Sequence, residues 1–349
     1  MKIGVLGAGQ LGQMLALARP SLDLKFVFMD PSSEACAAHL GDMIVGEFTD
    51  QKKLALFCDS VDLVTYESEN IPASCAEFVA AHRPIYPGLN ALITAQDRLV
   101  EKNFFSALGI PVAEFLTIDN NEELMKAAEM LGFPFIVKTR RQGYDGKGQF
   151  FIKNLQDLDQ VKKWYLTNAL AEKKVNFQRE ISIIALRAKN GETRFYDLCE
   201  NRHENGILRQ TQNRPNDPLF NMAKHYAQKM LEKLDYVGIL VIEFFDCDGV
   251  LIANEMAPRV HNSGHWTIEG AKCSQFENHL RAICGLPLGD TQSLGNFLMT
   301  NIIGDFKPYA SLLNMPGVFV HDYGKAARPG RKLGHVTQLI GQLRHENPQ

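Results

Sequence analysis

The sequence has little of what marks a nucleic-acid-binding, membrane-spanning or secreted protein. Its net charge is only −3 over 349 residues, so there is no overall positive charge to attract nucleic acid. No apolar run approaches the roughly 20 residues that a membrane-spanning helix needs. Met1 leads directly into a short apolar stretch, without the pattern of a signal peptide. We therefore expect a cytoplasmic protein with no nucleic-acid or membrane partner.

Cysteine is present, but its spacing does not suggest chemistry. The seven cysteines are scattered, their number is odd, and no Cys-x-x-Cys pair occurs. This favours reduced thiols over disulfides or a cysteine-based zinc site. The sequence also lacks a Gly-x-Ser-x-Gly elbow, a Walker A motif, a protein-kinase signature, internal repeats and low-complexity tracts. Nothing in it therefore suggests a covalent enzyme intermediate.

A glycine-rich motif stands at the N-terminus. An apolar strand at 3–6 runs into Gly7-x-Gly9-x-x-Gly12 and then into an expected helix. This order of elements is the fingerprint of a dinucleotide-binding unit. A second strand ends at Asp30, where an acidic residue would meet a ribose hydroxyl. Taken alone, the motif predicts an NAD-binding oxidoreductase, and the rest of the chain has to be weighed against that reading.

The alternation of apolar segments predicts three regions. Strands and helices alternate up to Pro87-Gly88, which indicates a doubly wound α/β domain over 1–95. A linker helix and a small α+β unit follow over 96–180, and longer strands predict a large antiparallel sheet over 181–349. The expected helices span 10–19, 50–58, 72–82, 95–108, 122–131 (capped by Asn121) and 155–170. The expected strands span 3–6, 26–29, 63–66, 133–138, 150–153, 180–186, 194–200, 238–245, 250–256, 297–303 and 318–323.

A second glycine-rich stretch, TRRQGYDGKGQ at 139–149, lies between two expected strands. A dinucleotide fold would place a helix after the glycines, whereas strand–loop–strand makes a flap. Glycines let backbone N–H groups approach phosphate oxygens, and Lys138 at the end of its strand can direct an ammonium toward the same phosphates. The alternative is a solvated hairpin loop.

Two glutamates flank an expected hairpin turn. Glu243 and Glu255 are each six residues from Gly249, so a symmetric hairpin would place their carboxylates opposite each other. Opposed like charges need a cation between them, and Mg²⁺ shared with a nucleotide is the natural candidate. Asn254 adjoins this site. The alternative is two unrelated surface glutamates.

Two further segments are rich in hydrogen-bond donors. The loop APRVHNSGHWT at 257–267 could surround a polar or anionic substrate, or could be purely structural. His261 and His265 have a spacing that could hold zinc on a helix, but Asn-Ser-Gly between them favours a turn. The segment 325–335 gathers four cations around Pro329-Gly330, which suits a phosphomonoester but is also common in solvated loops.

Together these stretches resemble ATP-grasp enzymes, and more narrowly the N5-carboxyaminoimidazole ribonucleotide synthetase family of purine biosynthesis. The matching motifs are GAGQLGQM, DRLVEK, RRQGYDGKGQ, NEMAPRVHNSGHWT and RPGRKLGH, which span nearly the whole chain. The resemblance implies an ATP-grasp fold with a Rossmann-like N-terminal domain that does not use NAD, a small flap domain and a large C-terminal domain. It leaves Asp30 without a ribose to bind.

The resemblance also implies a reaction. ATP and bicarbonate would form carboxyphosphate, and 5-aminoimidazole ribonucleotide would then be carboxylated, with release of ADP and phosphate. The family is typically a homodimer, so we expect one here. Other ATP-grasp ligases, such as a formate-using glycinamide ribonucleotide transformylase or a biotin carboxylase, stay open as alternatives. So does a non-catalytic nucleotide-binding protein.

The family's functional residues carry over by position in its motifs. The expected ATP contacts are Arg98, Lys138, Gly143, Tyr144, Asp145, Gly146, Lys147, Gly148, Gln149, Glu172, Lys173, Lys174, Val175, Glu180, His203, Asn254 and Glu255, with the backbone of 172–175 at the adenine and Glu180 at the ribose. Glu243 and Glu255 would bind Mg²⁺, or Mn²⁺ in its place.

The substrate side of the site is assigned in the same way. The catalytic group around bicarbonate and the amine would be Asp145, Lys147, Arg259, His261 and Asn262, with His261 or Asp145 transferring the proton. The ribonucleotide would meet Gln10, Leu11 and Ser263, and its phosphate Lys325, Arg331 and Lys332. Gln13 stands where many members of the family carry arginine.

Overall fold

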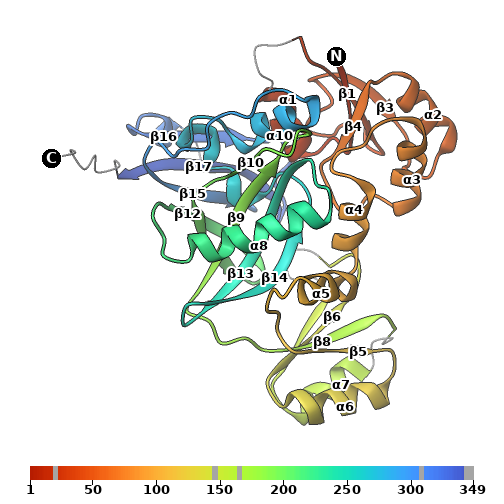
Figure 1. Ribbon diagram of the computed structural model, residues 1–349, viewed down its shortest axis with the longest axis vertical. Coiled ribbons are helices and arrows are strands. Elements are labelled where there is room, and N and C mark those ends of the chain that lie inside the picture. The colour runs from red at the N-terminus through yellow and green to blue at the C-terminus, as the bar shows by residue number, and fades with distance from the viewer. Residues whose placement is uncertain (19–22, 144–147, 163–166, 306–309, 342–349) are drawn as a thin grey trace.

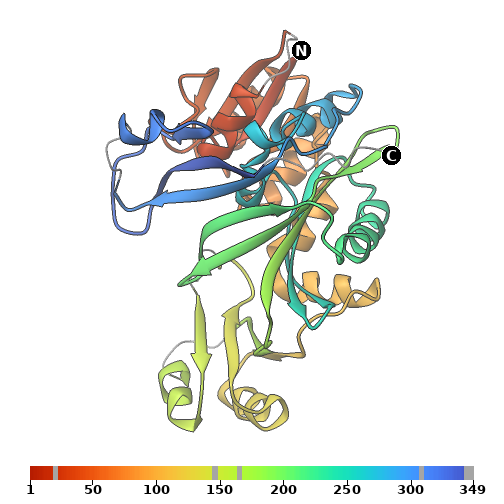
Figure 2. The same ribbon diagram turned by 90° about the vertical axis from the view of Figure 1, so that its left-hand side faces the viewer.

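The computed structural model describes residues 1–18, 23–143, 148–162, 167–305 and 310–341. Three sheets organise the chain, and the large sheet lies between the other two (Figures 1 and 2). No helix among these residues has both the length and the apolar character that crossing a membrane requires.

The N-terminal sheet is parallel, as the alternating pattern predicts. Its strands are β1 (Lys2–Leu6), β2 (Lys25–Asp30), β3 (Asp42–Val45) and β4 (Leu63–Tyr66), in the order β3-β2-β1-β4. The helices α1 (Gln10–Leu17), α2 (Gln51–Asp59) and α3 (Ala73–His82) connect or follow them. The edge strand β3 was not predicted, because its apolar run, Met43 to Val45, is only three residues long and ends at an exposed residue.

The expected helix at 95–108 is confirmed over 98–107 but starts too early, because a separate helix ends just before it. α4 (Leu89–Gln96) ends before Asp97, and α5 (Arg98–Ala107) begins after it. Asp97 has extended backbone angles, and its carboxylate accepts a hydrogen bond from the N–H of Leu99 as the N-cap of α5. The break turns the chain so that Arg98 opens a new helix.

The small sheet is antiparallel, in the order β5-β8-β6-β7. Its elements are β5 (Phe115–Ile118), α6 (Asn121–Leu131), β6 (Phe135–Thr139), β7 (Gln149–Ile152), α7 (Leu155–Lys162) and β8 (Ala169–Lys173). β6 and β7 pair directly, which confirms strand–loop–strand around the flap. The expected helix 155–170 is too long, because Ala169 and Leu170 open β8, and the cap of α6 is Asn120 rather than Asn121.

The large sheet has nine strands, in the order β14-β13-β9-β11-β12-β15-β17-β16 with β10 beside β9. They are β9 (Arg179–Arg187), β10 (Thr193–Phe195), β11 (Leu198–Glu204), β12 (Ile207–Arg214), β13 (Gly238–Cys247), β14 (Val250–Ala257), β15 (Asn296–Ile303), β16 (Val318–Asp322) and β17 (Lys332–Gly341). The helical segments here are α8 (Phe220–Lys233), η1 (Asn262–Gly264), α9 (Thr267–Gly270), α10 (Gln275–Cys284) and α11 (Ala310–Leu313). The single strand expected at 194–200 is wrong, since it divides into β10 and β11.

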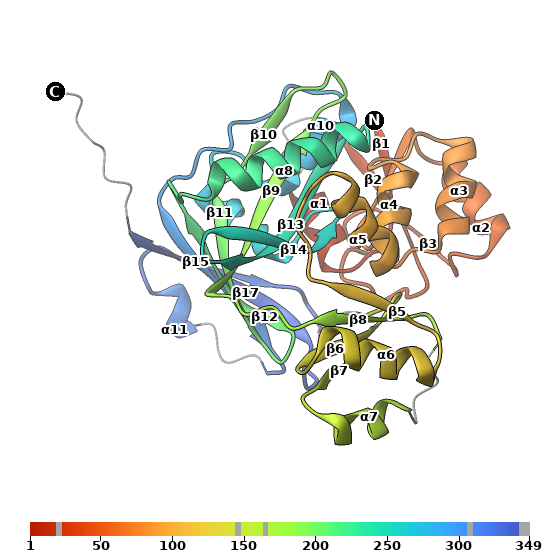
Figure 3. The same cartoon turned by 60° about the horizontal axis from the view of Figure 1, so that its bottom comes forward.

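Alternate residues of β9 face two different cores. Ile183 and Ala185 pack in the core beneath α8, which covers one face of the sheet (Figure 3). Ile184 and Leu186 pack in the other core, together with Val5 of β1 and residues of α10. The N-terminal sheet and the large sheet therefore share one core, which fixes the glycine motif relative to the hairpin glutamates.

Candidate active site

The two hairpin glutamates lie opposite each other because of a β-bulge. The turn between β13 and β14 has Asp248 and Gly249 in left-handed conformations, with φ of 53° and 84°. A two-residue turn of this kind, continued regularly, would pair Glu243 with Asn254. Instead the register shifts beyond Phe244, so that Glu243 pairs with Glu255 and Asn254 is the extra residue. The expected opposition of the carboxylates is confirmed, and the bulge produces it.

These carboxylates carry negative charge that the protein only partly balances. Arg98 Nη1 lies 3.4 Å from Glu255 Oε2 and balances part of this charge, whereas His261, whose Nε2 lies 3.7 Å from Glu243 Oε1, has a lowered pKa and adds no positive charge near pH 7. Burial, followed by the charge of Glu255, raises the pKa of Glu243 above its usual range. No cluster of three or more metal-ligating side chains occurs in the described part of the chain. Two opposed carboxylates without a third protein ligand in this part fit Mg²⁺ held jointly with phosphate oxygens.

A buried ion-paired group surrounds Lys138 at the end of β6. Its Nζ lies 2.8 Å from Glu172 Oε2, and Lys102 Nζ lies 3.4 Å from Glu172 Oε1. Burial alone would raise the pKa of Glu172, but the two ammonium groups outweigh it and lower that pKa to about 2. The expectation for Glu172 concerned its backbone, whereas the structure also gives its side chain a role in holding Lys138. Lys102 was missed, although it belongs to the DRLVEK motif.

Glu180 and His203 form a pair on neighbouring strands of the large sheet. His203 Nδ1 lies 2.8 Å from Glu180 Oε2. Burial opposes a charge on the imidazole, but the hydrogen bond to Glu180 and the charge of Glu243 raise the pKa of His203 above its usual value. Glu180 is opposite Phe245 in the register of β9 with β13, the strand that carries Glu243. The Glu180–His203 ion pair therefore lies close to the hairpin glutamates.

Arg259, in the loop after β14, forms an ion pair with Glu69 of the N-terminal domain. Arg259 forks onto Glu69: Nη2 lies 2.9 Å from Oε1, and Nε contacts Oε2. Arg259 outweighs the effect of burial and lowers the pKa of Glu69. Sequence reasoning missed Glu69, because its partner lies 190 residues away and only the fold brings them together.

His261 and its neighbours form a hydrogen-bonded group. His261 Nδ1 lies 2.9 Å from Ser263 Oγ, whose hydroxyl lies 3.0 Å from Ser182 Oγ. Asn262 exchanges hydrogen bonds with Asn301 of β15. Burial, then the charge of Arg259, lowers the pKa of His261 well below its usual value, so the ring is neutral near pH 7.

The second histidine of this loop has a different environment. His265 is fully buried and its ring packs beside Phe276 and His335, with centroid distances of 5.5 and 4.9 Å. Its partners are those of a core residue.

The predicted phosphate-binding cations lie on either side of one turn. Lys325 Nζ contacts Gln10 Oε1 at the start of α1, and burial lowers the pKa of Lys325. Arg331 Nη1 lies 3.1 Å from the carbonyl of Ala326. Lys332 opens β17, and its positive charge acts on both Glu243 and His261.

Other predicted residues lie outside this group or outside the description. Tyr144, Asp145, Gly146 and Lys147 fall outside the described residues. Gly148 accepts a hydrogen bond from Thr139 N–H at 2.8 Å and closes the flap hairpin. Lys173 and Lys174 are exposed.

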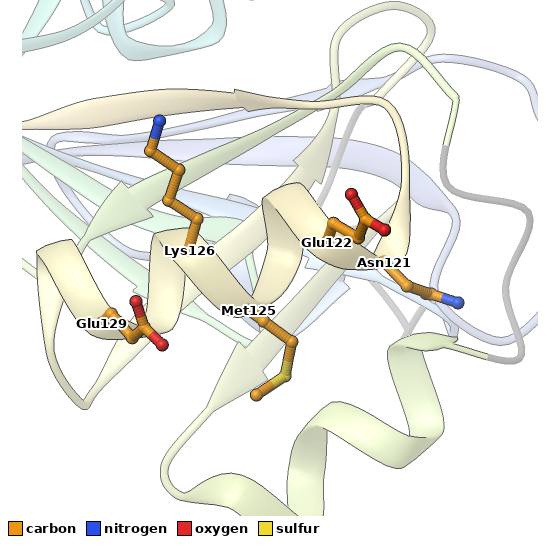
Figure 4. A pocket seen from close by; sticks show the side chains of 5 residues that line it. All are labelled: Asn121, Glu122, Met125, Lys126 and Glu129. Atoms are coloured by element: carbon orange, nitrogen blue, oxygen red, sulfur yellow. The ribbon is translucent and has the colours of Figure 1, made fainter.

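A shallow hollow on the small domain is lined by Asn121, Glu122, Met125, Lys126 and Glu129, all of α6 (Figure 4), and contains no predicted site residue.

The N-terminal glycine motif is closed to a dinucleotide by the protein's own carboxylate. Glu67 accepts hydrogen bonds from the N–H of Gly9 at 2.5 Å and of Gly12 at 2.7 Å. Asp30 accepts from Ala8 N–H at 2.9 Å and from Ser32 N–H at 2.8 Å, and so braces its own loop. The donors that a pyrophosphate would use are therefore taken, which disfavours the NAD reading.

Comparison with known proteins agrees with this geometry. An ATP-grasp domain matches residues 103–276, a ribonucleotide synthetase pre-ATP-grasp domain matches 1–96, and a phosphoribosylaminoimidazole carboxylase C-terminal domain matches 298–345. The matching domains and the opposed glutamates thus define an ATP-grasp ligase.

The relatives narrow this class to one family. N5-carboxyaminoimidazole ribonucleotide synthase of Pseudomonas aeruginosa is 48% identical over 338 residues, covering 97% of this chain and 94% of the relative. The Brucella melitensis enzyme of that name is 42% identical over 347 residues, covering 97% and 96%. The chain belongs to the N5-carboxyaminoimidazole ribonucleotide synthase family.

Solved structures give the same result. The Thermus thermophilus synthetase has a TM-score of 0.92 at 48% identity, covering 97% of this chain and 93% of that one. The Aspergillus clavatus synthase, solved with ADP and 5-aminoimidazole ribonucleotide, has a TM-score of 0.90 at 30% identity, covering 98% and 94%. Neither the oxidoreductase nor another ATP-grasp ligase is favoured by these matches.

Proposed function

We propose that this chain carboxylates 5-aminoimidazole ribonucleotide with bicarbonate, converting ATP to ADP and phosphate. The observation that carries the proposal is the opposed pair Glu243 and Glu255, placed between Arg98 on one side and His261 on the other. An Aspergillus clavatus relative binds ADP together with 5-aminoimidazole ribonucleotide, which supports the choice of substrates. A homodimeric, cytoplasmic enzyme is part of the proposal by family resemblance.

The first step is a phosphoryl transfer, which needs positioning and charge neutralisation more than covalent catalysis. Arg98 and Lys138 would hold the ATP phosphates, since Arg98 lies beside Glu255 and Lys138 is a buried cation held in place by Glu172. Glu243 and Glu255 would hold Mg²⁺, or Mn²⁺ in its place, which neutralises phosphate charge when bound. A bicarbonate oxygen attacks the γ-phosphorus, ADP leaves, and carboxyphosphate results.

The second step transfers the carboxyl group from carboxyphosphate to the exocyclic amine: an N–C bond forms, the C–O bond to phosphate breaks, and inorganic phosphate leaves. Arg259 is held by Glu69 in a fixed orientation and would bind bicarbonate and then carboxyphosphate as an anion. Because His261 is neutral near pH 7, it can accept the amine proton, whereas a permanently charged imidazolium could not. Lys325, Arg331 and Lys332 would hold the ribonucleotide phosphate and keep the amine facing His261.

The test is ADP release from Mg²⁺-ATP in bicarbonate buffer, with and without 5-aminoimidazole ribonucleotide. Strong stimulation by the ribonucleotide, lost when bicarbonate is removed, is the expected result. Glycinamide ribonucleotide with formate serves as the competing substrate pair and should give no stimulation. Stimulation by that pair, or by neither pair while Mg²⁺-ATP still binds, would overturn the proposed substrates.

A further inference from the structure

The glycine motif has an occupant built into the protein. Glu67 follows β4 directly, and its carboxylate lies at the N-terminus of α1. The first amides of a helix have no partner within the helix, and Gly9, the N-cap of α1, has no side chain to supply one. Glu67 supplies the missing acceptor from another part of the sheet, to both Gly9 and Gly12.

The glycines are shaped around this carboxylate. A Cβ at Gly7 would lie 2.6 Å from Glu67 Cγ, and a Cβ at Gly9 would lie 2.6 Å from Glu67 Oε1. Gly7 also has a φ of 97°, which side chains rarely adopt. In a dinucleotide-binding protein these backbone amides would bind a pyrophosphate, whereas here they bind the Glu67 carboxylate. A nucleotide phosphate approaching the motif would therefore be repelled by this carboxylate.

The same carboxylate lies beside the predicted substrate contacts. Gln10 follows Gly9 as the first residue of α1, and its side-chain oxygen contacts Lys325 Nζ. The negative charge of Glu67 also acts on Lys325. Two residues further along the chain, Glu69 holds Arg259. One short segment after β4 therefore holds the glycine loop, through Glu67, and the anion-binding arginine, through Glu69.

We propose that Glu67 is a positioning and specificity residue, which closes the glycine loop to nucleotide phosphates and holds Gln10 and Lys325 in place for the ribonucleotide. This inference rests on the proposed function for its substrate, but its structural part does not. Gly9 and Gly12 donate to a charged acceptor, and such bonds contribute more than neutral ones. Losing the acceptor should free both amides and release Gln10.

The experiment compares three variants with the wild-type enzyme. In Glu67→Gln only one oxygen can accept, so KM for the ribonucleotide should rise about tenfold, while the affinity for Mg²⁺-ATP stays the same. In Glu67→Ala the loss should be larger, and added acetate should restore part of the activity by binding to the free amides. Glu34→Gln, an exposed glutamate of the same domain, is the matched control and should behave as wild type.

Acetate binding is also measured without turnover. The thermal midpoint of Glu67→Ala should rise with acetate beyond the change seen for wild type, with sodium chloride at equal ionic strength as the reference. An unchanged KM in Glu67→Gln, or a folded Glu67→Ala that does not respond to acetate, would overturn the inference.

If Glu67→Ala does not fold, Glu67→Asp replaces it. The shorter carboxylate of Glu67→Asp should raise KM for the ribonucleotide, and an unchanged KM would also overturn the inference. If the wild type fails to respond to the ribonucleotide, the proposed function fails, and the acetate-dependent midpoint still decides the role of Glu67.

Discussion

Glu255 occupies its position opposite Glu243 only because β14 carries one extra residue, Asn254. We expect Glu255→Gln to reduce Mg²⁺-dependent turnover by about 100-fold or more, since one charged ligand is lost where phosphate charge must be neutralised. Its thermal midpoint should hold or rise, because the repulsion between the two carboxylates is relieved. Activity assays and thermal unfolding check this, with Glu129→Gln as an exposed control. An active Glu255→Gln enzyme would remove Glu255 from the metal site.

Glu101 is a buried carboxyl group whose role is to hold the neighbour of Glu255. It accepts a hydrogen bond from the N–H of Met256 at 2.6 Å, and burial followed by the charge of Glu255 raises its pKa to about 8. The folded protein therefore binds a proton here that the unfolded chain, with a pKa near 4.5, releases. The stability that this proton provides is present below about pH 4.5 and is lost as the pH rises to about 8.

Glu101→Gln should remove that pH dependence, because glutamine accepts the same bond without ionising. We expect the free energy of unfolding of the variant, relative to wild type, to increase by roughly 2–4 kcal/mol between pH 5 and 8. Urea unfolding of the ligand-free proteins across this range measures it. A constant difference between the two proteins would contradict the assignment.

The residues that could be predicted from the sequence differ from those that could not in where their partners lie. Glu243, Glu255 and Lys138 stand in motifs whose local pattern already indicates a hairpin or a strand end. Glu67 and Glu69 act on partners that are distant in the sequence, at Gly9 and Arg259, so no local pattern points to them. The sequence shows which side chains can ionise, but which group each of them contacts depends on how the chain folds.

At the scale of elements, Asp97 connects the start of α5 to the base of the flap. Its carboxylate lies 2.9 and 2.7 Å from Arg140 Nε and Nη2, and 3.2 Å from Arg141 Nε. Arg140 and Arg141 follow β6, and the N–H of Arg98 donates to the carbonyl of Arg140 at 3.0 Å. Asp97 therefore fixes Arg98 relative to the strand that carries Lys138.

Asp97→Asn keeps the helix cap but removes the charge that both arginines share. We expect it to lower the free energy of unfolding by roughly 1–3 kcal/mol and to raise KM for ATP while KM for the ribonucleotide stays unchanged. Asp50→Asn is the matched control, because Asp50 caps α2 through Lys52 and Lys53 N–H alone. Equal effects of the two substitutions would show that only the cap matters.

The missed strand β12 and the mistaken helix start near Asp97 have different physical causes. β12 alternates half-exposed polar residues such as Gln210 and Gln212 with buried Thr211 and Asn213, so it lacks the apolar alternation of a recognisable strand. The helix expected at 95–108 was started too early, and α4 was not predicted, because Asp97 in the sequence does not by itself show that the chain turns there and that its side chain caps α5. Strands β6, β9 and β13 were recognised because both of their faces are largely apolar.

At the scale of the whole molecule, His279 of α10 joins the N-terminal sheet to the large sheet. Its Nε2 lies 2.9 Å from Thr65 Oγ1 of β4, and its Nδ1 accepts the N–H of Ile239 of β13 at 3.1 Å. Gly238 makes room for the ring, since a Cβ there would lie 2.9 Å from His279 Cε1. This contact lies in the region where the two sheets share a core, so it connects the glycine loop to the hairpin glutamates.

Burial lowers the pKa of His279 to about 3, so the folded protein holds a neutral ring that the unfolded chain would protonate below about pH 6.5. The stability from this difference is present above pH 6.5 and is lost as the pH falls toward 3. His279→Gln should lower the free energy of unfolding at pH 7.5, by roughly 1–3 kcal/mol, because one or both bonds are lost. Relative to wild type, that deficit should shrink by roughly 2 kcal/mol between pH 6.5 and 5, since glutamine does not titrate. Urea unfolding at several pH values, with exposed His39→Gln as control, measures both slopes. Parallel slopes for wild type and His279→Gln would show that protonation at this contact does not govern the acid stability of the molecule.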